Sequence, residues 1–69
     1  MNAAKLHKSD RLKRVDDLLS DGREYSTQDI IDMAFVAAVS ASISELRSNG
    51  RQITCRRVKD IWLYKREFV

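Results

Sequence analysis

The sequence predicts a small α+β domain in which three short helices are followed by a two-stranded β-hairpin. The chain has 69 residues, which is enough for one domain with a small core. Apolar residues recur at helical spacing as far as the Asn49–Gly50 pair. After that pair, β-branched residues alternate with polar ones, as is typical of strands.

The first helix is expected from about Asp10 to Ser20, with Ser9 as its N-cap and Gly22 ending it. Residues 1–8 have no apolar period, so we expect a flexible basic arm ahead of a domain that covers residues 9–69. The apolar side of this helix consists of Leu12, Val15, Leu18 and Leu19. Its solvent side is expected to carry Arg11, Lys13, Arg14, Asp16 and Asp17.

The second helix is expected from Thr27 to about Ala34, after a brief extended segment over residues 23–26. Ser26 can act as N-cap, Asp29 favours the positive end of the helix, and Tyr25 can pack on Ile30. The helix would bury Ile30, Ile31 and either Met33 or Ala34.

The third helix is expected from Ala37 or Ser40 to Ser48, with Gly50 supplying the left-handed exit. Its buried face would consist of Val36, Val39, Ile43 and Leu46. Its exposed face would consist of Ala37, Ala41, Ser44, Glu45 and Ser48, with Ser40 and Arg47 at the margins.

The hairpin is expected from two extended runs, over residues 52–56 and 61–68, with Arg56, Arg57 and Lys59 at its tip. A terminal helix over residues 59–68 is the alternative. Cys55 alternates with Ile53 and is expected to be buried. Trp62 and Tyr64 share one side of the last strand, where they either pack on the core or form an exposed aromatic pair for a partner.

This order of elements is that of a winged helix-turn-helix domain, and one segment sharpens the likeness. The stretch from Ser42 to Ile53, S-I-S-E-L-R-S-N-G-R-Q-I, resembles the R-I-S-E-L-R-x-x-G-x-x-I motif of small helix-turn-helix domains from bacteriophages, prophages and other mobile elements. Residues 26–30 similarly resemble the capped start of that family's second helix. The resemblance covers about residues 11–68, and its clearest departure is Ser42, where the family commonly has Arg.

The resemblance implies a double-stranded DNA-binding protein that acts as a transcriptional regulator or as an accessory factor in recombination or replication. The third helix would enter the major groove, and the basic hairpin and arm would contact phosphates. Because Ser42 replaces Arg, the reading surface would lack a long donor for guanine, while Glu45 could accept from cytosine. The candidate DNA-binding residues are Ser40, Ser44, Arg47, Arg51, Arg56, Arg57 and Lys59.

The charge distribution also favours a polyanionic partner. The net charge is +3, but residues 1–14 carry five basic and one acidic side chain, and residues 36–69 carry seven basic and three acidic. Residues 15–35 between them carry six acidic side chains and one basic one. A molecule with such asymmetry can present a basic face to nucleic acid.

Other classes of protein are less well supported by the sequence. One Cys and one His cannot close a tetrahedral zinc site, and no catalytic constellation or cofactor motif is found, so we expect neither an enzyme nor a cofactor. The single Cys and the lack of a long apolar segment favour the cytoplasm, without membrane contact. The resemblance implies that this is the cytoplasm of a bacterial host. Tight binding by so small a module would require a homodimer or cooperative assembly on DNA. The alternative is a winged-helix module that binds and modulates a host protein.

Overall fold

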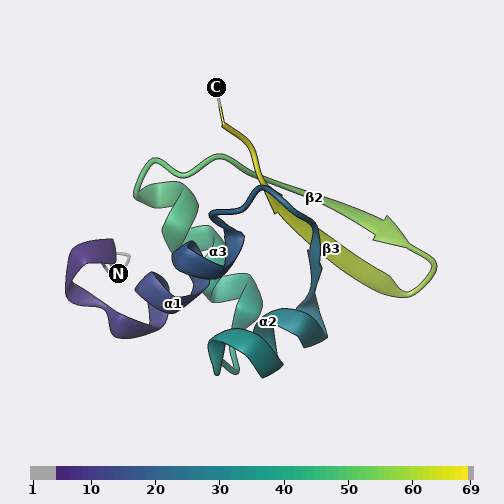
Figure 1. Ribbon diagram of the computed structural model, residues 1–69, viewed down its shortest axis with the longest axis horizontal. Helices are drawn as coiled ribbons and strands as arrows, with labels where there is room; N and C mark the ends of the chain where they lie inside the picture. The colour runs from purple at the N-terminus through teal and green to yellow at the C-terminus, as the bar shows by residue number, and fades with distance from the viewer. Residues whose placement is uncertain (1–4, 69) are drawn as a thin grey trace.

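The computed structural model describes residues 5–68 and shows an α+β arrangement of three helices and a three-stranded antiparallel sheet (Figure 1). The order along the chain is α1 (Asp10–Leu19), β1 (Tyr25–Ser26), α2 (Thr27–Ala34), α3 (Val39–Ser48), β2 (Ile53–Val58) and β3 (Ile61–Arg66). This arrangement is compatible with a winged helix. None of the helices in the described part of the chain is long and apolar enough to cross a bilayer.

The caps expected from the sequence position α1 and α2. Ser9 Oγ accepts from the Leu12 backbone N–H at 3.2 Å and begins α1. Ser26 and Asp29 form a reciprocal capping box at the start of α2, with bonds of 3.0 and 3.1 Å. Each cap satisfies backbone N–H groups that have no partner inside the helix. The expected bounds of these two helices are therefore confirmed to within one residue.

The third helix ends at Ser48, as expected, but it begins at Val39, between the two starts considered. Gly50 follows it with a φ of +88°, a conformation that glycine adopts without steric cost. The Arg51 N–H donates to the Leu46 carbonyl at 3.0 Å and closes the helix end.

The sheet corrects the expected two-stranded hairpin, because β1 adds a third strand in the order β1-β3-β2. Tyr25 lies opposite Tyr64, and Ser26 lies opposite Leu63. A pair of only two residues has no pattern of its own in the sequence, so its partner could not be foreseen. Residues 61–66 form a strand, which excludes the alternative of a terminal helix.

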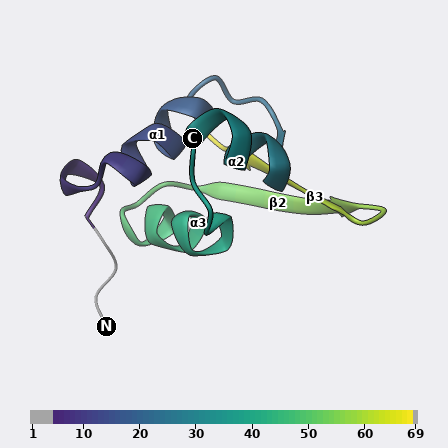
Figure 2. The same cartoon turned by 90° about the horizontal axis from the view of Figure 1, so that it is seen from below.

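The register of β2 and β3 assigns each side chain to one of two faces. Cys55 lies opposite Tyr64, and Arg57 lies opposite Trp62; directly opposed residues share a face. The inner face, which carries the buried Tyr64, consists of Ile53, Cys55, Arg57, Trp62, Tyr64 and Arg66. The outer face consists of Thr54, Arg56, Val58, Ile61, Leu63 and Lys65. Beyond the base of the sheet the hairpin projects past the helices, with α3 on one side and α1 and α2 on the other (Figure 2).

The core lies where the three helices meet the base of the sheet. It consists of Leu12, Val15, Leu19, Ile30, Ala34, Val36, Val39, Ile43, Leu46, Ile53 and Tyr64. The expected buried faces of the helices supply most of this set. In α2 the choice between the two candidates falls on Ala34, because Met33 is 56% exposed.

Three expectations about side chains are wrong. Cys55 is exposed, because its side chain lines the open groove beside α3 and does not enter the core. Trp62 is 44% exposed while Tyr64 is buried, so the two do not share one role. Arg11 and Asp16 lie half-buried between α1 and other elements, whereas the sequence assigned both to the solvent side.

The expected N-terminal arm falls partly outside the described residues, which begin at Lys5. Leu6–Lys8 form one turn of 3-10 helix. The Leu6 N–H donates to Asn49 Oδ1 at 3.0 Å, and the Leu6 side chain packs against the core. This turn therefore contacts the end of α3.

Candidate nucleic-acid interface

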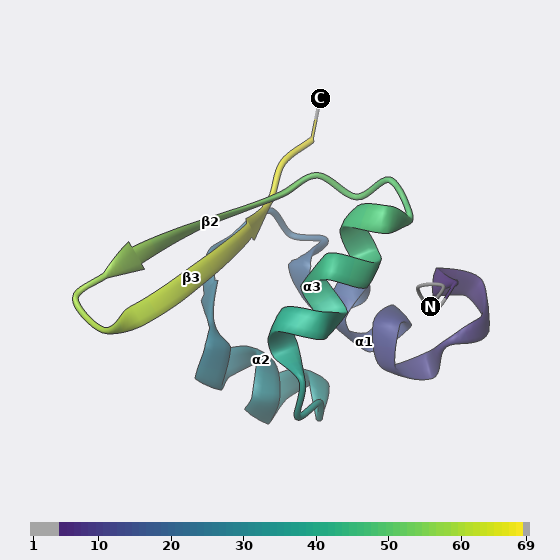
Figure 3. The same cartoon turned by 180° about the vertical axis from the view of Figure 1, so that it is seen from behind.

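A groove lies between α3 and the inner face of the hairpin. The groove is lined by Thr27, Ser40, Ile43, Arg47, Cys55, Trp62 and Tyr64. Figure 3 views the molecule from the side on which α3 lies in front, with the hairpin extending beside it. A helix and an adjacent hairpin are thus presented on one side of the molecule.

The exposed face of α3 is built from small side chains. Ser40, Ala41, Ser44 and Ser48 are all exposed, whereas Val39, Ile43 and Leu46 are buried in the core. Ser48 donates to the Ser44 carbonyl at 3.2 Å, and Arg47 is exposed at the edge of the groove. Small side chains allow close approach of another molecule to the helix backbone.

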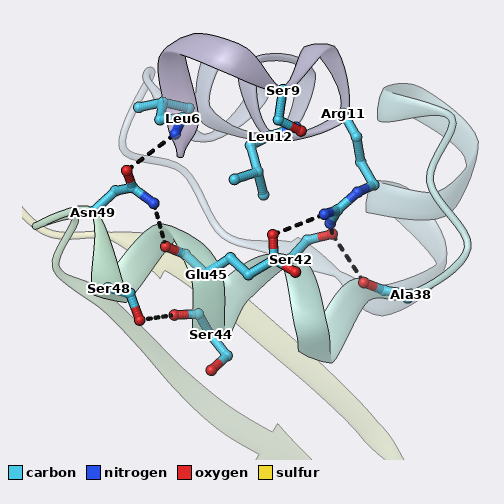
Figure 4. A network of polar contacts seen from close by, with 10 residues as sticks. All are labelled: Leu6, Ser9, Arg11, Leu12, Ala38, Ser42, Ser44, Glu45, Ser48 and Asn49. Carbon is cyan, nitrogen blue, oxygen red and sulfur yellow. Dashed lines mark hydrogen bonds and ion pairs between the residues drawn. The ribbon is translucent and has the colours of Figure 1, made fainter. Parts of the chain in front are cut away.

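A polar network fixes the opposite side of α3 against α1 (Figure 4). Arg11 of α1 donates to Ser42 Oγ at 2.6 Å and to Glu45 Oε2 at 2.8 Å. The Ser42 hydroxyl donates to the Ala38 carbonyl at 2.9 Å, and Ser42 is completely buried. The two hydrogen bonds from Arg11 therefore hold α3 at a fixed rotation about its axis.

This network corrects the expected reading surface. The sequence predicts Glu45 on the exposed face of α3, and the resemblance places position 42 on the reading surface, but both side chains turn toward α1. Where the motif that residues 42–53 resemble commonly has Arg, this chain has the buried Ser42. In its place a guanidinium reaches the same side of α3 from Arg11, 31 residues earlier. The exposed face of α3 consequently carries no carboxylate.

Arg47 joins α3 to the first strand of the hairpin. Its Nε and Nη2 donate to the Ile53 carbonyl at 3.1 and 2.8 Å, and Nη2 lies 4.0 Å from Cys55 Sγ. The guanidinium is still exposed at the edge of the groove. Its charge is therefore held at a fixed place between helix and strand.

Arg51 turns away from the groove. Its Nε donates to Asp16 Oδ1 at 2.9 Å, and its Nη2 donates to Asp16 Oδ2 at 3.4 Å. Arg66 donates to the same carboxylate at 3.1 Å. Asp16 thus joins α1 to the segment after α3 and to the last strand, and Arg51 forms part of this internal cluster.

Arg56 also turns away from α3, on the outer face of the hairpin. It donates from two nitrogens to the two carboxylate oxygens of Glu24, at 2.6 and 2.8 Å. This hydrogen bond lowers the pKa of Glu24 below its ordinary value of 4.5 and raises the pKa of Arg56. The pair ties the hairpin to the segment between α1 and β1.

The depressed pKa of Glu24 predicts a pH dependence for this attachment. A carboxyl whose folded pKa lies below its unfolded value contributes stability above the unfolded pKa and loses it as the pH falls through the folded pKa. We therefore expect an NMR titration to give Glu24 a midpoint below 4.5. Arg56→Gln should raise the midpoint of Glu24 toward the ordinary value, while the pKa of Asp21, which the Tyr25 hydroxyl lowers, should not change. Equal Glu24 midpoints in the two proteins would contradict the ion pair.

Arg57 and Lys59 lie at the end of the hairpin. Arg57 donates to the Lys59 carbonyl at 3.0 Å and to Asp60 Oδ1 at 3.2 Å, which closes the turn. Lys59 has a φ of +57° and is exposed; among residues 5–68 no carboxylate forms an ion pair with it. The expected loop of three cations is corrected, because Arg56 and Arg57 lie within β2 and point to opposite faces.

The seven candidate DNA-binding residues thus separate into two groups. Ser40, Ser44 and Arg47 lie on α3 beside the groove, and Arg57 and Lys59 lie at the hairpin end on the inner face and in the turn. Arg51 and Arg56 point elsewhere and are engaged by carboxylates.

Trp62 lines this groove, but it is not among the residues that the sequence predicts for DNA binding. The sequence linked Trp62 to the core or to a protein partner, but the side chain lines the groove across from Ser40 and Arg47. The alternation along β3 indicated a shared side with Tyr64. The side of β3 that faces α3 depends on the strand register, which the local sequence pattern does not determine.

Comparisons with known proteins found no match. No protein-family model matches the chain, and no curated protein or solved structure is significantly similar to it. Within residues 5–68, no group of three or more His, Cys, Asp or Glu side chains is placed to hold a metal ion.

Proposed function

We propose that the protein is a winged helix-turn-helix protein that binds double-stranded DNA, with the exposed face of α3 in the major groove and the end of the hairpin on the phosphate backbone. The observation that carries the proposal is the face of α3 formed by Ser40, Ala41, Ser44 and Ser48, beside the groove that Arg47 and Trp62 line. The major groove of B-DNA is wide enough to admit a helix.

The position of the charges supports the same proposal. Glu45 would repel phosphates on the exposed face, but it is paired with Arg11 on the other side of α3. Arg47 lines the groove, and Arg57 lies on the same face of the hairpin, paired with the exposed Asp60 of the turn that also carries Lys59. Serines on the helix can contact bases directly or through ordered water, while the cations contribute a sequence-independent attraction to phosphates. A role in transcription, recombination or replication on a phage or mobile element remains part of this proposal, through the motif of residues 42–53.

The test is a carboxylate placed at the centre of the proposed interface. Ser44→Glu should weaken the binding of a random-sequence duplex pool by about tenfold or more, because it opposes a carboxylate to phosphates in a confined groove. Gln52→Glu makes the same change of charge at an exposed residue beyond the helix and should weaken binding much less. Fluorescence anisotropy at low and high salt measures both, and wild-type binding should fall steeply with salt. Equal losses in the two variants would reject α3 as the interface.

A second signal comes from the single tryptophan of the chain. Because Trp62 lines the groove and is 44% exposed, DNA in the groove should quench or shift its emission. A duplex that binds without any change at Trp62 would place the contact on another face.

A protein-binding module is the second candidate function. It is favoured by the uncharged side chains along most of the exposed face of α3 and by the exposed indole of Trp62, since aromatic residues are enriched at interfaces between proteins. The two functions separate in the same titration. No binding of any duplex at low salt would reject DNA and leave the protein-binding module.

A further inference from the structure

Trp62 lines two hollows of the protein surface. The first is the groove described above, between α3 and the inner face of the hairpin. The second lies between the start of α2 and the hairpin end, and its other lining residues are Ser26, Thr27, Gln28, Asp60 and Ile61. Because Trp62 is 44% exposed, its indole can contact a ligand in either hollow.

The two hollows differ in charge. The groove contains the guanidinium of Arg47 and no carboxylate among the described residues that line it. The second hollow contains Asp60, which pairs with Arg57 at 3.2 Å, and no lysine or arginine among its described lining residues. An anionic ligand is therefore favoured in the groove and not in the second hollow.

Arg47 is held in place by a neutral acceptor. Its Nε and Nη2 donate to the Ile53 carbonyl at 3.1 and 2.8 Å, which fixes the guanidinium at the edge of the groove. Among residues 5–68, no carboxylate forms an ion pair with it. A guanidinium that is already positioned can bind a phosphate oxygen through a charge-assisted hydrogen bond.

The rest of the groove suits a flat, partly apolar ligand. Ile43 and Tyr64 belong to the core, so the inner part of the groove is apolar. Thr27 and Ser40 add hydroxyl groups, and Trp62 adds an aromatic face. The volume of about 510 Å³ is within the range of small-molecule sites. A nucleotide has a ring that stacks on aromatic side chains and a phosphate that binds arginine, so it matches both the aromatic and the cationic part of the groove.

A base must be unpaired to stack on this indole. Within a duplex each base lies between its stacked neighbours, so neither of its faces is open to a side chain. Where a duplex continues as a single strand, the unpaired bases present their faces and the backbone remains anionic. The groove can therefore distinguish such a junction from a continuous duplex.

We propose that the groove binds one unpaired nucleotide, with its base stacked on Trp62 and its phosphate on Arg47, so that the protein prefers duplex DNA that carries a single-stranded extension. The inference rests on the proposed function, because α3 would hold the duplex beside this extension. It adds to that function a class of DNA, the junction between double and single strands, and a residue that selects it, Trp62.

The test compares three DNA probes that share the same random-sequence duplex pool. The first has blunt ends, the second carries a short thymidine extension, and the third carries an extension of equal length made of abasic nucleotides, each in both polarities. The abasic extension keeps the phosphates and removes the bases. The thymidine probe should bind about tenfold more tightly than the abasic probe, which is the size of one stacking contact. Fluorescence anisotropy of labelled DNA measures the three affinities.

Three variants assign the preference to the indole. Trp62→Ala should bind the thymidine and abasic probes equally, whereas Trp62→Phe keeps an aromatic ring and should retain most of the preference. Phe68→Ala is the matched control, because Phe68 is 61% exposed and lines neither hollow, and it should show the wild-type ratio of affinities. Circular dichroism confirms that each variant is folded. In the wild type, the thymidine extension should also quench the emission of Trp62 more than the abasic one.

The result that would overturn this inference differs from the one that would overturn the proposed function. Equal wild-type affinities for the thymidine and abasic probes, or a preference that survives in Trp62→Ala, would reject the nucleotide site and leave duplex binding in place. A thymidine probe that binds beside a blunt duplex that does not would support the nucleotide site and reject the contact of α3 with duplex DNA. No binding of any probe would reject both and favour the protein-binding module.

Discussion

Replacement of Asp16 by Ala is expected to destabilise the protein by about 2–3 kcal/mol, because it leaves two arginines without their common partner. Asp16 accepts from Arg51 at 2.9 Å and from Arg66 at 3.1 Å. The side chains of Asp16 and Arg66 are only 17% and 18% exposed, and Arg51 is 33% exposed. The partial exposure of Arg51 keeps the expected loss below that of a fully buried pair.

The Arg66 guanidinium makes this loss larger than that of a surface ion pair. Its Nε is buried without a hydrogen-bond partner, so its bond to Asp16 supplies much of the compensation for burial. Without Asp16 the charge remains between α1 and the sheet, and a buried unpaired charge is costly. For a domain of this size, the expected loss lowers the thermal midpoint by about 10 °C or more.

Asp17→Ala is the matched control for this prediction. Asp17 is the next residue of α1 and is exposed, so its replacement should change the free energy of unfolding by no more than about 0.5 kcal/mol. Urea denaturation followed by circular dichroism measures both variants. Equal midpoints for the two would show that Asp16 does not hold the arginines together.

The same cluster illustrates how much of this molecule the sequence could predict. The ends of α1 and α2 depend on caps within four residues, and the sequence located both through Ser9 and Ser26. The partners of Asp16 lie 35 and 50 residues away. Charge type alone does not select one arginine among the many that the chain contains. The neighbouring residues alone therefore predict a DNA contact for Arg51.

The exposed face of α3 was predicted in part, for a related reason. The apolar residues Val39, Ile43 and Leu46 identified the buried direction, and Ser40 and Ser44 followed as exposed. The buried face of α3 is wider than its row of apolar residues, because α1 also packs against a polar residue of α3, Ser42. A buried serine gives no hydrophobic signal. Its burial became visible only with Arg11 placed against it.

The contact between Ser42 and Arg11 leads to the second large effect. Ser42→Arg restores the residue that the related motif commonly has, and it is expected to cost about 4 kcal/mol or more, which is most of the stability of a small domain. Ser42 is completely buried and already receives the Arg11 guanidinium at 2.6 Å. The variant forces a long cation into a filled space beside a like charge.

Exchanging the two residues should recover much of this loss. In the double variant Arg11→Ser with Ser42→Arg, the like charge is gone and a guanidinium at position 42 lies three residues before Glu45 on the same helix, within reach of its carboxylate. The interaction energy of the double-mutant cycle should therefore be favourable by more than about 1 kcal/mol. Additive effects would mean that the two positions do not compete for one space.

Ser40→Arg supplies the control on the same helix. Ser40 is exposed, so the same substitution there should change the free energy of unfolding by about 0.5 kcal/mol or less. A Ser42→Arg variant as stable as Ser40→Arg would show that position 42 faces solvent, and the guanidinium from Arg11 would then not substitute for the motif arginine. The contact between Arg11 and Ser42 fixes the rotation of α3 and therefore which side chains it exposes, among them Ser40 and Ser44. The double-mutant cycle thus also tests the geometry on which the proposed DNA interface depends.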